Sequence, residues 1–416
     1  MTGGSLFVSR NFGLLLLGQT TSQIGAQVSG VAIPLLAVLS LSATPFQVGL
    51  ITASSTLAFA LIGLPAGAWL DRFRRRPILI ASDVTRGILL ATIPVAAALG
   101  ALNITQLVVV SVLTGFARVF FDIGYQSYIP LVVGKYQVLA GNSSMESIRA
   151  SGQVIGPGLG GWLVTMVGAA NVVAVQAVAF AVSALSLVAI QTVETPIDPP
   201  THRPRLRAQI KEGLTFVGRN PILRATAIAS GASNFAFAIA SAVAFIFMAR
   251  ALALSATAIG LITAAGYLTV MFAAAATPRL SRGLGSVRVI WLSLAATGPV
   301  TLLSPLAQPG WSVALLVVGA AVGNAGQIVY AVTNLSLRQR LCPDTMLSRV
   351  TATMRFLIMG TLPVGALLGG VLGEVVGLRG TLWVSGVIVT LAALPLYLAL
   401  RRTRDVDDLA DWSAQP

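Results

Sequence analysis

Residues 41–53 read LSATPFQVGLITA, and residues 254–264 read LSATAIGLITA. The two segments share the letters LSAT and GLITA, and each enters an apolar run long enough for a membrane helix. Four glycines further along also return at one constant offset: Gly156, Gly160, Gly161 and Gly168 as Gly365, Gly369, Gly370 and Gly377. Two repeats in the same order at nearly the same offset predict a chain built from two related halves.

The composition indicates that the chain is dissolved in lipid. Its 416 residues are 56% hydrophobic and only 10% charged, and the mean hydropathy is +0.86. Soluble domains carry about 25% charged residues, so these few charges cannot cover a water-exposed surface. Since one spanning helix needs about 20 apolar residues, the chain has room for about twelve. We therefore predict an all-α membrane protein with twelve transmembrane helices in two six-helix halves.

Charges and clusters of proline or glycine interrupt the apolar runs and place the expected helices. The expected spans are 12–39, 46–70, 78–100, 106–127, 142–166, 170–190, 222–249, 257–278, 287–305, 311–335, 347–373 and 380–400. The predicted domains are an N-terminal bundle at 1–190, a basic connector at 191–221, a C-terminal bundle at 222–400 and a tail at 401–416.

The basic residues predict the orientation. They gather in alternate loops, at residues 72–76, 203–219, 279–288, 338–349 and 401–404, whereas the opposite loops hold only Arg250 and Arg379. Cytoplasmic loops are enriched in arginine and lysine, so we expect both termini in the cytoplasm and a multi-pass protein of the plasma (inner) membrane. The net charge of +14 then reflects topology and contact with anionic membrane lipids, and no nucleic-acid partner is expected.

Several chemistries lack the residues that they need. The single cysteine, Cys342, and the single histidine, His202, exclude a disulfide framework and cysteine or histidine metal clusters. The sequence contains no phosphate-binding loop and no nucleophile elbow. The N-terminal apolar stretch is too long for a cleaved signal peptide. We therefore expect no enzyme, no cofactor and no metal site.

Three segments resemble the major facilitator superfamily. Residues 67–76, GAWLDRFRRR, look like its loop motif G-x-x-x-D-R-x-G-R-R, with Arg74 in place of the second glycine. Residues 152–161, GQVIGPGLGG, look like the motif G-x-x-x-G-P-x-x-G-G of its antiporter branches. Residues 10–37 resemble the drug- and siderophore-exporter branch that includes macrolide efflux proteins and the enterobactin exporter, although Ala26 stands where that branch often has an acid. The resemblance implies the major facilitator fold, efflux and a monomer.

The resemblance also implies a cytoplasmic latch. In that family the loop aspartate and arginine join an acid at the end of the fourth helix, a place that Asp122 fits. The candidate gating residues are Gly67, Asp71, Arg72, Arg75, Arg118 and Asp122. The alternative interpretation is that the arginines only anchor the loop at the lipid headgroups, with Asp71 as a solvated counter-charge.

Three charged pairs fall inside the expected helices at spacings that place both members on one face: Asp83 with Arg86, Arg118 with Asp122, and Glu146 with Arg149. Ions in a membrane are usually paired and face the protein interior, so these pairs can simply hold helices together. Proton antiport needs a titratable group, and we predict Asp122 or Glu146 for this role. The alternative is that the protein does not use protons.

The antiporter-like motif consists of Gly152, Gly156, Pro157, Gly160 and Gly161. Its glycines form a stripe that permits close helix approach, and Pro157 bends the helix. We expect gating of the antiport type, with ordinary tight packing as the alternative.

A substrate cavity is expected at the midplane between the halves. The polar candidates at that depth are Gln19, Gln23, Gln27, Asn234, Asn324, Gln327, Tyr330 and Asn334. The same residues could instead make hydrogen bonds between helices.

These observations favour a secondary active exporter of small amphiphilic molecules (a drug, siderophore or metabolite), driven by proton antiport and rocking halves. Its expected partners are a small-molecule substrate, protons and membrane lipids. The alternatives are a lipid or lipid-linked translocase on the same fold and, against the antiporter-like motif, a nutrient symporter.

Overall fold

The structure is a computed structural model that describes residues 9–70, 73–134, 137–191 and 206–405. Within these ranges the chain is helical and contains no strand, which confirms the predicted all-α fold. The chain divides into two compact units. Unit 1 comprises Met1–Pro200 and Leu254–Ala264, and unit 2 comprises Thr201–Ala253 and Ala265–Pro416. The start of one helix of the second sequence repeat thus packs within unit 1, and the predicted domain boundaries remain predictions.

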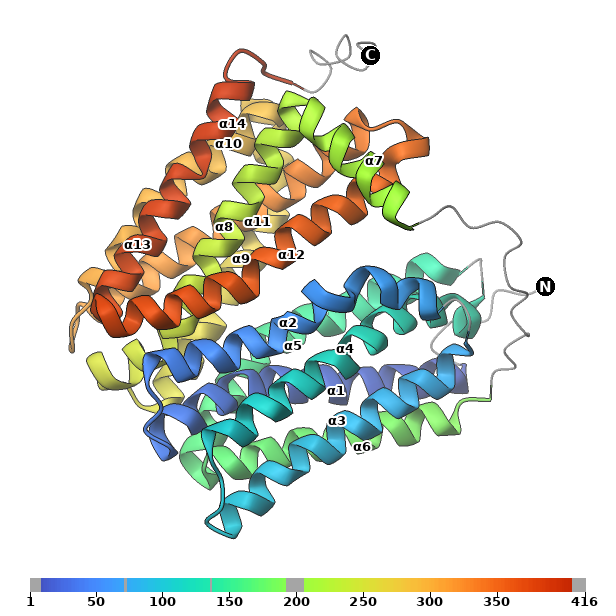
Figure 1. The fold of residues 1–416 in the computed structure, drawn as a ribbon, viewed down its shortest axis with the longest axis vertical. Coiled ribbons are helices and arrows are strands. Elements are labelled where there is room, and N and C mark those ends of the chain that lie inside the picture. Colours follow the sequence, from blue (N-terminus) through green and yellow to red (C-terminus); the bar gives the residue numbers. More distant parts are fainter. Residues whose placement is uncertain (1–8, 71–72, 135–136, 192–205, 406–416) are drawn as a thin grey trace. The chain divides into compact units, whose positions relative to one another are not determined.

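Unit 1 is a bundle of long helices that lie side by side (Figure 1, blue to green). They are α1 (Arg10–Leu35), α2 (Pro45–Leu70), α3 (Arg75–Ala98), α4 (Ile104–Val133), α5 (Val138–Val167) and α6 (Ala169–Ala189). Helix α1 packs on α5 and α6, α3 packs on α4 and α6, and α2 packs on α4. Their apolar core includes the fully buried side chains of Phe12, Leu79 and Tyr128.

Unit 2 also consists of packed helices and has an additional helix at its start. Its elements are α7 (Leu206–Arg219), α8 (Pro221–Ile246), α9 (Ala256–Leu284, whose first turns belong to unit 1), α10 (Ser286–Thr297), a 3₁₀ helix (Pro299–Leu306), α11 (Val313–Leu341), α12 (Asp344–Val375), α13 (Gly377–Leu391) and α14 (Ala393–Leu400). Over the described residues, eleven helical segments are long and apolar enough to cross a membrane. Helix α7 lies inside the segment that we expected to be only a polar connector, and it packs on α12 through the buried Val217.

The backbone confirms the internal repeat and corrects its register. Helices α1 and α8 each end in a π-helical turn, Leu36–Ser40 and Phe247–Ala251, followed by a residue with positive φ, Ser42 or Ala253. The hydroxyl oxygens of Thr44 and Ser255 then accept backbone N–H bonds at the starts of α2 and α9. The two GLITA segments are therefore equivalent, whereas the two LSAT segments are displaced by two residues because Ser255 takes the capping position of Thr44.

The start of α10 is capped by the chain that follows α14. The carbonyl oxygen of Arg404 accepts hydrogen bonds from the N–H groups of Val287 (3.1 Å) and Arg288 (3.3 Å). A carboxylate oxygen of Asp405 accepts bonds from the backbone N–H of Ser286 (2.8 Å) and from its hydroxyl (3.2 Å). These contacts satisfy amide groups that a helix start leaves without intrahelical partners.

We expect the contribution of Asp405 to stability to disappear in acid. The N–H of Ser286 lowers the pKa of Asp405 below its ordinary value of 3.8. A lowered carboxyl pKa stabilises the folded state above the unfolded-state pKa, and this contribution is lost as the pH falls through the folded-state pKa. The melting temperature of Asp405→Asn should therefore lie below that of the wild type above about pH 5, and the difference should shrink as the pH falls below 3.8. A constant difference across this range would contradict the assignment.

Candidate functional site

The glycine stripe of α5 forms a close contact with α1. A methyl group at Gly156 would collide with the side chain of Gln27, and one at Gly160 would lie 2.6 Å from the carbonyl oxygen of Val28. Gly152 is less crowded, since the same group there would meet Gln23 at an ordinary 3.7 Å. The stripe therefore permits backbone approach that any larger residue would prevent.

The second repeat makes the equivalent contact. Methyl groups at Gly365 and Gly369 of α12 would lie 2.6 Å and 2.5 Å from the carbonyl oxygens of Phe235 and Ile239 of α8. Gly168 and Gly377, which follow α5 and α12, both have positive φ, at 83° and 77°. Both repeated glycine sets thus have the same structural role, namely close packing followed by a left-handed turn.

The outer face of the α5 motif contacts the start of α9 within unit 1. A side chain on Gly161 would collide with the carbonyl oxygen of Ala256, and one on Gly260 would collide with that of Pro157. One helical turn further along α5, the hydroxyl oxygens of Thr165 and Thr257 lie 2.9 Å apart and share a hydrogen bond. Gly260 is not among the site residues that the sequence predicts, although it belongs to the repeated GLITA segment.

This geometry predicts a cysteine cross-link. With Cys342→Ala as background, Thr165→Cys combined with Thr257→Cys should oxidise to a disulfide, since the two hydroxyl oxygens are already 2.9 Å apart. The matched control combines Thr165→Cys with Thr263→Cys, which lies about 9 Å further along α9. Mobility on a non-reducing gel measures the reaction. Equal oxidation of both pairs would contradict the α5–α9 contact.

The gating candidates are only partly described. Asp71 and Arg72 lie outside the described residues, Gly67 lies within α2, and Arg75 is the first residue of α3. Arg118 and Asp122 form an ion pair on α4, with Nε and Oδ2 3.4 Å apart and side chains 60% and 35% exposed. The predicted latch therefore stays a prediction.

Arg76 has a role that the motif did not suggest. Its Nε donates to the carbonyl oxygen of Leu187 (2.8 Å), and its Nη2 donates to that of Val188 (2.5 Å). These carbonyl groups lie at the end of α6, where a cation also complements the helix dipole.

The two other charged pairs have very different surroundings. Glu146 and Arg149 form a bidentate pair on α5 with side chains 63% and 48% exposed. Asp83 and Arg86 form a 3.2 Å pair on α3, in which Asp83 is completely buried. The Arg86 guanidinium lies 3.8 Å from the ring centre of Phe180 and 5.4 Å from that of Phe121. Sequence spacing alone could not separate the buried pair from the exposed one.

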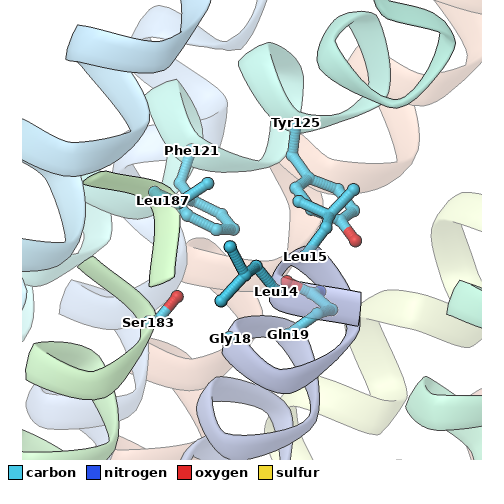
Figure 2. Close-up of a pocket in the computed structure, with 8 residues that line it drawn as sticks. All are labelled: Leu14, Leu15, Gly18, Gln19, Phe121, Tyr125, Ser183 and Leu187. Carbon is cyan, nitrogen blue, oxygen red and sulfur yellow. The ribbon is translucent and has the colours of Figure 1, made fainter. Parts of the chain in front are cut away.

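The expected cavity residues of unit 1 lie on α1. Gln23 and Gln27 are partly buried and lie beside Gly152 and Gly156 of α5. Gln19 is buried and lines a small cavity among α1, α4 and α6 together with Leu14, Leu15, Gly18, Phe121, Tyr125, Ser183 and Leu187 (Figure 2). The cavity holds about 10 Å³, which is room for about one water molecule and far below the volume of a drug-sized ligand.

The expected cavity residues of unit 2 lie on α8 and α11. The Tyr330 hydroxyl is bonded to the Ser230 hydroxyl (2.6 Å) and donates to the carbonyl oxygen of Thr226 (3.1 Å). Asn334 donates to the Tyr330 hydroxyl (3.3 Å), and Asn234 donates to the carbonyl oxygen of Ser230 (2.9 Å). For Tyr330 and Asn334, both buried, this network favours the alternative of hydrogen bonding between helices. Asn324 and Gln327 are partly buried.

Repeated halves, many apolar spanning helices and glycine-lined helix contacts define a multi-pass membrane protein built from two related halves. The sequence model of the Major Facilitator Superfamily matches residues 15–247 and 226–413. The chain therefore belongs to this superfamily, and membership confirms the predictions of a transporter rather than an enzyme and of a multi-pass membrane protein.

Curated relatives resemble the chain over most of its length. It is 28% identical over 411 residues to a protein named multidrug efflux pump Tap from Mycolicibacterium fortuitum, covering 95% of this chain and 96% of that one. It is also 28% identical over 383 residues to Tap of Mycobacterium tuberculosis (strain CDC 1551 / Oshkosh), covering 88% of both chains.

Solved structures share the fold. A bacterial homologue of the iron transporter ferroportin in its inward-facing state has a TM-score of 0.74 at 17% identity, covering 98% of this chain and 100% of that one. The nucleoside transporter NupG has a TM-score of 0.71 at 16% identity, covering 93% and 99%. At these identities the likeness concerns the fold alone.

Proposed function

We propose that this protein exports small amphiphilic molecules, drugs among them, across the plasma membrane by proton antiport. The observation that carries the proposal is the match over nearly the whole chain to proteins named multidrug efflux pump. The antiporter-like glycine motif of α5 supports it, because its glycines make close contacts with both α1 and α9. In this proposal both termini are cytoplasmic and the protein acts as a monomer.

Alternating access is the proposed mechanism, and the α5–α9 contact is its proposed outer gate. Gly161 and Gly260 let the two helices meet at backbone distance, and the Thr165–Thr257 hydrogen bond is a contact that can break and re-form. The proposed inner latch consists of the loop motif at residues 67–76 together with Arg118 and Asp122. The proposed substrate cavity includes Gln23 and Gln27. Asp122 and Glu146 stay the proton-coupling candidates from the sequence.

Ethidium accumulation in cells tests export directly. In bacteria without their own major efflux pumps, a strain that expresses the wild type should retain less ethidium than a strain that carries the empty vector. Collapse of the proton gradient with an ionophore should remove this difference. Equal retention in both strains would contradict ethidium export, and a difference that survives collapse would contradict proton antiport. A parallel assay with fluorescent phospholipids in reconstituted vesicles distinguishes an exporter of small molecules from the alternative, a lipid translocase.

The cysteine pair at Thr165 and Thr257 tests alternating access in the same cells. Oxidation should stop ethidium export, and a reductant should restore it, because the cross-link holds α5 and α9 together. Full export by the cross-linked protein would show that this contact does not open during transport.

A further inference from the structure

Four charged residues of unit 1 form an electrically neutral cluster between α3 and α4. Asp83 and Arg86 belong to α3, and Arg118 and Asp122 belong to α4. The two pairs also interact electrostatically with each other. Asp83 is completely buried, whereas the side chain of Asp122 is 35% exposed. The cluster therefore connects a buried carboxylate to one that solvent can reach.

The surroundings of Asp83 combine one counter-ion with few other polar groups. Its counter-ion is Arg86, whose guanidinium lies over the Phe180 ring of α6, and the Ser183 hydroxyl of α6 also interacts with the carboxylate. Helix α6 contributes no charged residue, and Oδ2 of Asp83 has no hydrogen-bond partner of good geometry among the described residues. The ion pair with Arg86 is therefore the main compensation for this buried charge. Arg86 keeps its contacts with the Phe121 and Phe180 rings when Asp83 becomes neutral.

A seam of buried polar residues leads along the α1–α6 interface to this pair. Gly18 and Gly25 bring α1 close to α6, and the buried Ser22 and Ser29 lie on the same stripe of α1. Across the interface, α6 contributes Gln176 and Ser183. Two buried atoms of this seam, Ser29 Oγ and Gln176 Oε1, lack a hydrogen-bond partner among the described residues.

The small cavity adjoins the end of the seam at Ser183. Figure 2 shows Ser183 and Gln19 at its wall together with the Phe121 ring. Its volume of about 10 Å³ suits about one water molecule. Polar atoms along a buried interface, and room for water beside Ser183, which interacts with Asp83, are features that a proton path needs.

We propose that Asp83 is the buried proton acceptor of the transport cycle. A proton that enters along the α1–α6 seam binds one carboxylate oxygen, and the neutral carboxyl group separates from Arg86. The same proton leaves through the α3–α4 cluster toward Asp122, and the ion pair forms again, so protons and charge balance. This inference rests on the proposed function, because it names the coupling group of a proton antiporter. In this proposal Asp122 is the solvent-accessible end of the proton path, and Glu146 takes no part in proton transfer.

The test compares the neutralisation of two ion pairs, one buried and one partly exposed. Asp83→Asn/Arg86→Gln removes the buried pair, and Glu212→Gln/Arg349→Gln removes a pair with side chains 50% and 33% exposed that joins α7 to α12. Each full-length protein is reconstituted into liposomes, and ethidium transport is followed with and without an imposed pH gradient. Ethidium binding in detergent and monodisperse elution show that each variant is folded.

We expect the gradient to stimulate transport by the wild type and by the Glu212/Arg349 variant, and to leave the Asp83/Arg86 variant with at least about tenfold less stimulation. Stimulation of all three proteins would overturn the role of Asp83, since a purely structural pair can be replaced by a neutral one. Absence of stimulation in the wild type would instead overturn proton antiport and this inference with it.

Asp83→Glu provides the second measurement if the neutral pair does not fold. It keeps a carboxyl group opposite Arg86 but moves it by one methylene. Gradient-driven transport should persist, with its pH midpoint shifted by about half a unit or more. A pH profile identical to that of the wild type would contradict the assignment of the proton to this site.

Discussion

Replacement of Gly160 by alanine is expected to lower the melting temperature of the protein, and replacement by leucine is expected to abolish transport. The new methyl group would lie 2.6 Å from the carbonyl oxygen of Val28, and backbone atoms cannot move aside as a flexible side chain can. Overpacking of this kind costs about 1–3 kcal/mol for the smallest substitutions. Thermal unfolding in detergent and ethidium export in cells measure the two effects.

Gly158 provides the matched control on the same helix. A methyl group there would be 3.8 Å from its nearest neighbours, Leu261 and Ala264, so Gly158→Ala should be tolerated. Alanine should in addition favour the helical conformation at both positions by up to about 1 kcal/mol. If Gly160→Ala were as stable as Gly158→Ala, the close contact between α5 and α1 would be wrong.

The single substitution Asp83→Asn is expected to destabilise the protein more than the double substitution Asp83→Asn/Arg86→Gln. The single variant leaves Arg86, whose side chain is 9% exposed, without its counter-charge. Loss of one partner of a buried ion pair costs about 3–5 kcal/mol, whereas replacement of both partners is often nearly neutral. Melting temperatures of both variants and of Arg86→Gln complete the double-mutant cycle.

Glu146→Gln is the corresponding control on an exposed pair. The side chains of Glu146 and Arg149 are 63% and 48% exposed, so solvent screens their interaction. Such pairs contribute about 0–1 kcal/mol, and the substitution should change the melting temperature little. For the buried pair, by contrast, the changes in melting temperature caused by Asp83→Asn and Arg86→Gln should not add up in the double variant. Strictly additive changes would contradict an interaction between Asp83 and Arg86.

The fold could be predicted from the sequence because each spanning helix needs its own apolar run. The repeat was visible too, yet its register was not, because Ser255 and Thr257 can both cap a helix and only the structure selects Ser255. Helix α7 was missed because it lies at the polar connector, where no long apolar run marks a helix.

The candidate site could be predicted by residue type but not by environment. The α5 motif predicted tight packing, but its partners Val28 and Gly260 depend on which helices meet. Tyr330 and Asn334 have the polarity and depth of cavity residues, and sequence cannot distinguish a cavity wall from the interior of a bundle. Asp83, Asp122 and Glu146 are all acids inside apolar helices, and only the structure separates the buried one from the exposed ones.

Proton movement driven by substrate alone tests the central proposal most directly. Wild-type protein is reconstituted into liposomes that contain a pH-sensitive dye, and an ethidium gradient is imposed with no initial pH difference. Proton antiport predicts that protons move in the opposite direction to ethidium, so that inward ethidium flow makes the lumen more alkaline. Control liposomes that contain the dye but no protein should show no pH change. Ethidium movement without a pH change, or with protons moving in the same direction, would contradict the account.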